Sequence, residues 1–132
     1  MLDAAGPPAP ALSSVVIASR ELTLDGNQKV EVLIGKPEPC PGGIDWYCPH
    51  QTVGVGTGRV RYAIGVDTVQ ALVLALSMVG AELYTSEEYE AHRLNWDGGA
   101  VKGDLGFPVP PNIRDALPAY AQPSSAGNGD RK

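Results

Sequence analysis

The chain is poor in the residues that build most recognisable sites. Only two cysteines and two histidines occur among its 132 residues, and its ten lysines and arginines are spread thinly from Arg20 to Lys132. A nucleic-acid binder gathers such residues into a basic stripe that neutralises phosphates, so this scatter and the net charge of −5 argue against a nucleic-acid partner. Two cysteines do not make a disulfide framework, and we expect both to be reduced.

Long hydrophobic runs are also scarce. The first 14 residues, MLDAAGPPAPALSS, carry an acid and three prolines where a secretory signal would carry a basic start and an apolar core. The longest apolar stretch, from Asp67 to Tyr84, is shorter than the roughly 20 residues that span a bilayer, and it contains Gln70, Ser77 and Gly80. We therefore expect a cytoplasmic protein with no membrane segment.

Turn-forming residues divide the first half of the chain into strands. Apolar and polar residues alternate on both sides of Asp25-Gly26, which predicts a β-hairpin over residues 14–35. The prolines of the following segment, residues 36–43, argue against regular structure there. A third strand is expected over residues 44–55, interrupted or placed at a sheet edge by Pro49, and a fourth over residues 59–65.

The long apolar stretch predicts a helix. Asp67 stands at the N-cap position, and Gln70 follows three residues later as in a capping box. Thr85 and Glu88 repeat this spacing before SEEYEAHRL, which predicts a short second helix. The prolines at 108, 110 and 111 then require an extended C-terminal segment.

Strands followed by helices indicate an α+β domain, with an antiparallel sheet of about four strands packed on the long apolar helix. We expect this single domain to occupy residues 14–120, between disordered tails at 1–13 and 121–132. The helix is apolar almost all round, so a sheet covers only one of its sides. We expect the segment from Leu105 to Tyr120 to fold across the other side, with a second protein chain as the alternative.

The densest group of reactive side chains lies around the predicted third strand. Cys40, Cys48 and His50, joined by His92 or Asp45, would supply the four ligands of a zinc site. Their spacing matches no pattern that lets two ligands share one turn, so we expect no metal and no cofactor. Cys48 with His50 as its base is a second hypothesis, but alternate strand residues lie roughly 6 to 7 Å apart, too far for a hydrogen bond.

Three further residues are candidates for binding. Trp46 and Trp96 stand beside acidic or amide residues, and large aromatic side chains in such positions can form a recognition surface. The alternative is that both anchor the core near loop ends. Gln70 either caps the long helix, which we favour, or is a buried amide that reaches the sheet.

Four short motifs together resemble a family of small bacterial domains of unknown function. They are D-W-x-C at 45–48, G-V-D-x-x-Q-A-L at 65–72, W-x-G-G at 96–99 and G-F-P at 106–108. The resemblance extends from about Val15 to Pro108. It implies a bacterial, cytoplasmic, single-domain protein, compatible with an accessory encoded beside a larger partner, and it carries no catalytic or binding residue. The residues at the motif positions include Asp45, Trp46, Cys48, Asp67, Gln70, Trp96, Gly106 and Pro108.

The sequence supports two hypotheses about function. The first is a small non-enzymatic protein-interaction module, of the immunity-protein, antitoxin or accessory kind, that binds a protein partner or a second copy of itself. It rests on the acidic balance, the apolar helix and the lack of a convincing catalytic group. The second is a small enzyme or ligand-binding domain centred on Asp45, Cys48 and His50.

Overall fold

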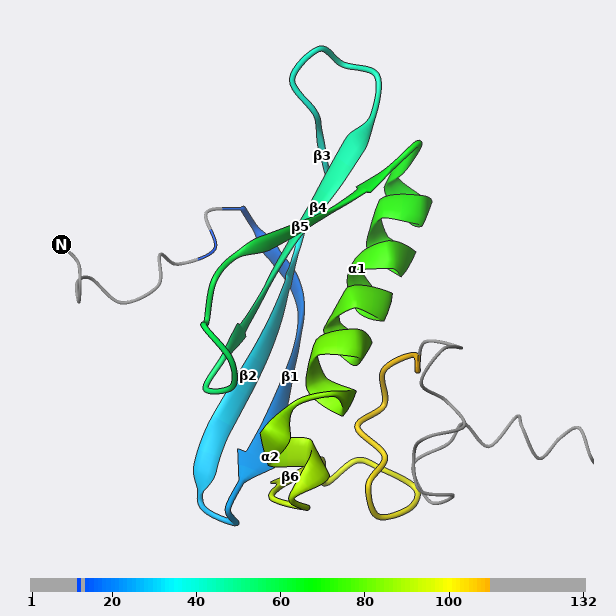
Figure 1. Cartoon of the computed structure of the whole chain (residues 1–132). Helices are drawn as coiled ribbons and strands as arrows, with labels where there is room; N and C mark the ends of the chain where they lie inside the picture. The colour runs from blue at the N-terminus through cyan, green and yellow to red at the C-terminus, as the bar shows by residue number, and fades with distance from the viewer. Residues whose placement is uncertain (1–11, 13, 110–132) are drawn as a thin grey trace, which may run out of the picture. The chain divides into compact units, whose positions relative to one another are not determined.

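The computed structural model describes residue 12 and residues 14–109. The expected tails, Leu12 apart, and the part of the Leu105 to Tyr120 segment beyond Val109 lie outside these residues. Along the chain follow β1 (Val16–Leu24), β2 (Gln28–Gly35), β3 (Glu38–Pro39), β4 (Trp46–Val53), β5 (Arg61–Gly65), α1 (Thr68–Tyr84), α2 (Glu87–Glu90) and β6 (Leu94–Asn95) (Figure 1).

The predicted α+β class is confirmed. The strands form one antiparallel sheet in the order β3-β4-β2-β1-β6, and β5 pairs with β4. The four predicted strands are β1, β2, β4 and β5, and the two-residue strands β3 and β6 are additional. The expectation that the proline-rich segment lacks regular structure is wrong at β3, where Glu38 and Pro39 lie opposite Tyr47 and Trp46. A sheet edge tolerates a proline because one side of an edge strand needs no donor.

The described residues divide into two compact units. One comprises residues 12–21 and 30–75, and the other residues 22–29 and 76–109. The strands β1 and β2 and the helix α1 each contribute to both units.

In the first unit, β4 is an interior strand, and the expectation that Pro49 interrupts it or places it at an edge is wrong. It pairs with β5 on one side, and with β2 and β3 on the other. Pairing with β3 ends at Tyr47 and pairing with β2 begins at His50, so Pro49 lies in the gap between two partner strands. Gly35 lies beside the Pro49 ring in that gap, where a Cβ would approach the ring to 2.7 Å.

The core of the first unit lies on one face of the sheet. Residues directly opposite each other in neighbouring strands share a face, and Ile34 lies opposite His50 while Cys48 lies opposite Ala63. All four side chains are buried. The same unit buries Val30, Val32, Val55, Ala71 and Ala75.

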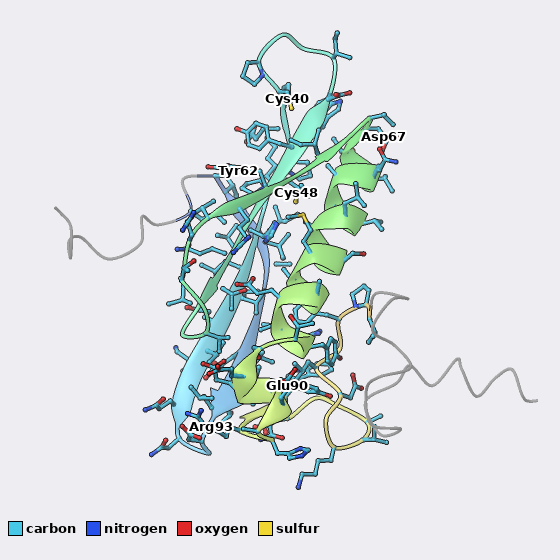
Figure 2. All side chains as sticks on the ribbon, in the orientation of Figure 1. Cys40, Cys48, Tyr62, Asp67, Glu90 and Arg93 are labelled. Carbon is cyan, nitrogen blue, oxygen red and sulfur yellow. The ribbon has the colours of Figure 1, made fainter. Side chains whose placement is uncertain are left out.

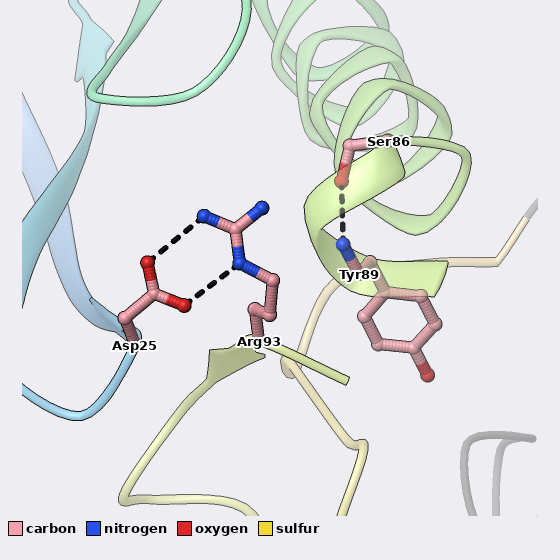
Figure 3. A network of polar contacts seen from close by, with 4 residues as sticks. All are labelled: Asp25, Ser86, Tyr89 and Arg93. Carbon is pink, nitrogen blue, oxygen red and sulfur yellow. Dashed lines mark hydrogen bonds and ion pairs between the residues drawn. The ribbon is translucent and has the colours of Figure 1, made fainter. Parts of the chain in front are cut away.

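The second unit begins at the turn of the β1–β2 hairpin. Asp25 and Gly26 adopt positive φ angles of 56° and 77°, which confirms the predicted turn at these residues. The Asp25 carboxylate accepts two hydrogen bonds from the Arg93 guanidinium, at 2.7 and 2.8 Å (Figure 3). Strand β6 pairs with the end of β1, where Leu94 lies opposite Leu24.

The second helix is shorter than predicted and has a different cap. The Ser86 hydroxyl, not that of Thr85, accepts the hydrogen bond from the Tyr89 backbone N–H at 3.1 Å (Figure 3). The Thr85 hydroxyl instead donates to the Ala81 carbonyl at 2.6 Å. The helix ends at Glu90, so the last part of SEEYEAHRL is not helical, and His92 has a positive φ of 61°.

Two tyrosines fix the segment that follows. Tyr84 and Tyr89 pack edge to face with ring centroids 5.0 Å apart. The Tyr89 hydroxyl donates to the Gly103 carbonyl at 2.7 Å, and the Tyr84 oxygen accepts from the Leu105 N–H at 3.0 Å. The backbone of Pro108 then lies directly against Gly80 of α1, where there is no space for a Cβ.

Candidate functional site

The start of α1 is fixed by the predicted cap. Asp67 Oδ1 accepts from the Gln70 N–H at 2.8 Å, and Gln70 Oε1 accepts from the Val66 N–H at 2.7 Å. In a standard capping box the second bond would come from the N–H of the cap residue itself, so here it comes from one residue earlier. Gln70 is exposed, and its role is therefore that of the favoured capping residue (Figure 2 shows Asp67 at this end of α1).

A close contact decides which side of α1 faces the sheet. Gly65, the last residue of β5, lies against the backbone of Ala71, and there is no space for a Cβ at position 65. Small side chains permit such an approach, so Ala71 and Ala75 are fully buried. The larger Val69 and Val73 are consequently turned toward solvent.

The result is an exposed apolar surface, which we call the α1 outer face and define as Val66, Val69, Val73 and Leu74. Val66 and Val69 are 69% and 68% exposed, and Val73 and Leu74 are about half exposed. Val69 and Val73 lie four residues apart and are therefore surface neighbours on the helix, while Leu74 lies one residue further round it. Asp67 is the one charged residue from residue 66 to residue 81 in the sequence.

The candidate residues of β4 lie in the core. Cys48, His50 and Thr52 are alternate residues of the strand and face the same side, and all three are almost fully buried. The Cys48 thiol donates to the Gly35 carbonyl at 3.4 Å. His50 Nε2 and Thr52 Oγ1 are buried without a hydrogen-bond partner among the described residues.

The electrostatics of this row do not favour nucleophilic catalysis. Burial raises the pKa of the Cys48 thiol, whereas the reactive form of cysteine is the thiolate. Burial, aided by the positive charge of Arg61 opposite in β5, lowers the pKa of His50 from 6.5 to about 4. At neutral pH both groups are therefore uncharged, and this arrangement suits packing better than proton transfer.

Cys40 and Asp45 lie outside this row. Both precede β4, in the loop where the Cys40 N–H donates to the Asp45 carbonyl at 2.8 Å, and Figure 2 shows Cys40 there and Cys48 on the strand. Among the described residues no group of three or more histidine, cysteine, aspartate or glutamate side chains is placed to hold a metal ion.

The two tryptophans lie in different units and are both half-buried. Trp46 begins β4, opposite Pro39 on one side and Gly65 on the other. Trp96 follows β6, with Gly98 packed against its ring, and its carbonyl accepts from the Gly99 N–H at 3.2 Å. Gly98 gives the Trp96 ring a local packing contact, and Trp46 takes part in strand pairing.

One small cavity lies in the second unit. Its volume of about 10 Å³ is room for about one water molecule, which is too little for an organic ligand. It is lined by Tyr89, His92, Leu94, Asn95, Lys102 and Gly103.

Some features of the site were not predicted from the sequence. The anchoring role of Tyr84 and Tyr89 is one, and their position at the end of one helix and in the next was the available signal. The other is the identity of the exposed helix face. Gly65 followed by Ala71 and Ala75 at helical spacing was the signal for close packing, and it marks the opposite face as the exposed one.

Residues 18–109 match the family model described as Domain of unknown function (DUF6968), and the chain belongs to this family. The matched range agrees with the resemblance expected over Val15 to Pro108. No curated protein and no solved structure matches the chain. Among the described residues, no helix has the length and apolar character needed to cross a membrane.

Proposed function

We propose that this member of the family is a small non-enzymatic protein-interaction module of the bacterial cytoplasm, of the immunity-protein, antitoxin or accessory kind. The observation that supports this proposal is the α1 outer face. It presents four aliphatic side chains to solvent at the start of α1. The Asp67 cap and the contact with Gly65 fix this start of the helix in place. A reducing compartment suits the two free cysteines, Cys40 and Cys48.

The energetic argument concerns the exposed aliphatic area. Complete burial of a valine or leucine side chain stabilises by about 1.5 to 3 kcal/mol. The members of the α1 outer face retain between 40% and 69% of their exposure, so a partner that covers them gains roughly 1 kcal/mol from each. The rigid start of α1 also lowers the entropy cost of binding.

The chemistry of the partner follows from this surface. A helix that presents apolar residues three and four apart fits an apolar groove. Asp67 lies at the edge of the surface and favours a lysine or arginine at the rim of that groove. We therefore expect a protein partner, and we expect neither nucleic acid nor a membrane to bind.

An enzyme or ligand-binding domain centred on Asp45, Cys48 and His50 is the alternative. It would require the buried thiol and imidazole to meet a substrate and exchange a proton. The raised pKa of Cys48 and the lowered pKa of His50 oppose this, because each favours the neutral group. The interaction module is therefore the better-supported function.

The test is affinity capture with the full chain from a lysate of the organism that encodes it, beside a variant carrying Val69→Glu and Val73→Glu. A partner retained by the native chain and lost with the variant would then be purified and its binding measured by calorimetry. We expect a defined stoichiometry and at least about a hundredfold loss of affinity, because two buried charges would replace two apolar contacts.

The matched control is Ile44→Glu. Ile44 is 83% exposed in the loop before β4, so the substitution adds a charge to another exposed aliphatic position. It should leave the affinity unchanged, and all variants should keep the native circular dichroism spectrum. A partner that binds the double variant as tightly as the native chain would refute the assignment of the α1 outer face.

A further inference from the structure

The sheet of the first unit carries an aromatic patch on the face opposite its core. Tyr47 and Pro49 alternate along β4 with the buried side chains of the core and therefore point to the other face. In β5, Ile64 lies directly opposite Tyr47, and Tyr62 lies directly opposite Pro49. Residues directly opposite each other share a face, so the four side chains form one surface, which we call the outer sheet patch.

The aromatic part of the outer sheet patch is accessible to solvent. Tyr62 is 55% exposed, and Tyr47 is half-buried (Tyr62 is labelled in Figure 2). The two rings pack edge to face with their centroids 5.6 Å apart, and this contact orients each ring against the other. Proline-rich segments dock on surfaces that are lined by aromatic rings. The patch therefore has the chemistry of a polyproline-binding surface.

The chain enters the described part of the structure beside this patch. The Leu12 side chain and the Pro49 ring lie 2.8 and 2.7 Å from the position that a Cβ at Gly35 would take. Leu12 is therefore a neighbour of Pro49 on the outer face. From Pro49, Tyr62 is one strand spacing away, about 4.8 Å, and Tyr47 is two residues along β4, roughly 6 to 7 Å.

The residues that precede Leu12 match the chemistry of the patch. Residues 6–10 read G-P-P-A-P, in which Pro7 and Pro10 have the P-x-x-P spacing of polyproline ligands. Proline fixes its own φ angle and makes the preceding residue extended, so this sequence favours a polyproline II helix. Such a helix has three residues per turn, which places Pro7 and Pro10 on the same edge.

We propose that Pro7 and Pro10 pack on the tyrosine rings of the outer sheet patch in their own chain. A polyproline II helix rises about 3.1 Å per residue, so Pro10 lies about 6 Å and Pro7 about 15 Å from Leu12. This reach covers the distances to both tyrosines. The helix has no internal hydrogen bonds, so its carbonyls can also accept from the tyrosine hydroxyls.

The chain's own segment is favoured over another molecule because Leu12 already holds it beside the patch. A short tether gives the segment an effective concentration on the order of millimolar, which a free peptide must match to compete. The prolines also lose little conformational entropy on binding. This contact orders part of the tail that the sequence pattern assigns to disorder. It is separate from the α1 outer face and does not depend on the proposed function.

NMR of the full, isotope-labelled chain tests the proposal. Protons held over the face of an aromatic ring move upfield, so the Pro7 and Pro10 ring protons should be shifted upfield while those of Pro8 are not. The shifts should be lost in Tyr62→Ala. They should remain in Tyr62→Phe, which keeps the ring and changes the fold least.

A double variant, Pro7→Ala with Pro10→Ala, provides a second measurement, and Pro8→Ala is its matched control. Pro8 lies in the same tract but on another edge of the polyproline II helix. The double variant should free the patch. A synthetic peptide of residues 5–11 should therefore bind the double variant at least about tenfold more tightly than the native chain. Pro8→Ala should bind the peptide as weakly as the native chain does.

The same measurements can overturn the proposal. Proline shifts that are absent from the native chain, or that persist in Tyr62→Ala, would refute the contact. Shifts that appear only as the protein concentration rises would assign the prolines to a second copy of the chain. Equal binding of the peptide to the native chain and the double variant would show that the patch is not occupied by its own chain.

Discussion

Gly65 of β5 and Ala71 of α1 lie in backbone contact, and no Cβ fits between them. Their contact places the small residues of α1 toward the sheet within the first unit. It thereby turns Val69 and Val73 outward, and the α1 outer face is a consequence of a single close approach.

Gly65→Ala should destabilise the protein. An added methyl must push the helix backbone away from β5, and such overpacking typically costs about 1 to 3 kcal/mol. The free energy of unfolding measured with urea would show the loss. Val66→Ala, at the exposed neighbouring residue, should change it by less than about 0.5 kcal/mol. Equal values for the two variants would contradict the close contact.

His50 should make the protein sensitive to acid. Its pKa is about 4 in the folded protein and near 6.5 when exposed, so between these values the unfolded chain binds more protons. The contribution of neutral His50 is fully present above pH 6.5 and is lost as the pH falls toward 4. The pKa difference corresponds to about 3 kcal/mol of unfolding free energy.

Urea unfolding at a series of pH values would measure this loss. His50→Leu should remove most of the dependence between pH 6.5 and 4, because leucine has no proton to bind. Thr52→Val, which removes a neighbouring buried hydroxyl without changing charge, should leave the dependence in place. A native chain whose stability is flat over this range would show that His50 is not buried in its neutral form.

The two cysteines should differ in reactivity. Cys48 is fully buried and its pKa is raised, while Cys40 is partly exposed. A thiol reagent should therefore label one cysteine per folded chain and both after unfolding in urea. Cys40→Ser should abolish labelling of the folded protein. Rapid labelling of Cys48 in that variant would revive the enzyme hypothesis.

Asp25 should titrate below its ordinary range. Hydrogen bonds from the Arg93 guanidinium lower the pKa of the Asp25 carboxyl. Burial raises this pKa, but its effect is smaller. Carboxyl carbon shifts measured by NMR over a pH series would report this pKa. In Arg93→Gln it should return toward 3.8. An unchanged pKa in the variant would contradict the paired geometry in Figure 3.

Local signals in the sequence predicted the elements well where the competing choices were few. The Asp25-Gly26 turn and the Asp67 cap each rest on a few adjacent residues whose chemistry permits one backbone conformation. The sequence predicts the cap of α2 one residue too early because Thr85 and Ser86 are both good cap residues. Only the hydrogen bonds of the folded chain distinguish them.

Tertiary relationships were beyond the sequence patterns. The edge placement of Pro49 failed because the rule that a central strand excludes proline assumes a continuous partner. Here the partner changes from β3 to β2 across that residue. The alternation of Cys48 and His50 correctly predicted a shared face, but it carried no information on whether that face was open or buried.

The glycine-rich turn between β4 and β5 has a consequence for proteases. Its glycines at 54, 56 and 58 all have positive φ, yet Val55 between them is buried and the Gln51 amide donates to the Gly58 carbonyl at 2.8 Å. A protease must draw several residues into an extended conformation before it cuts. Because Val55 must first leave the core, we expect this turn to resist cleavage, although its glycine-rich composition is typical of an easily cleaved loop.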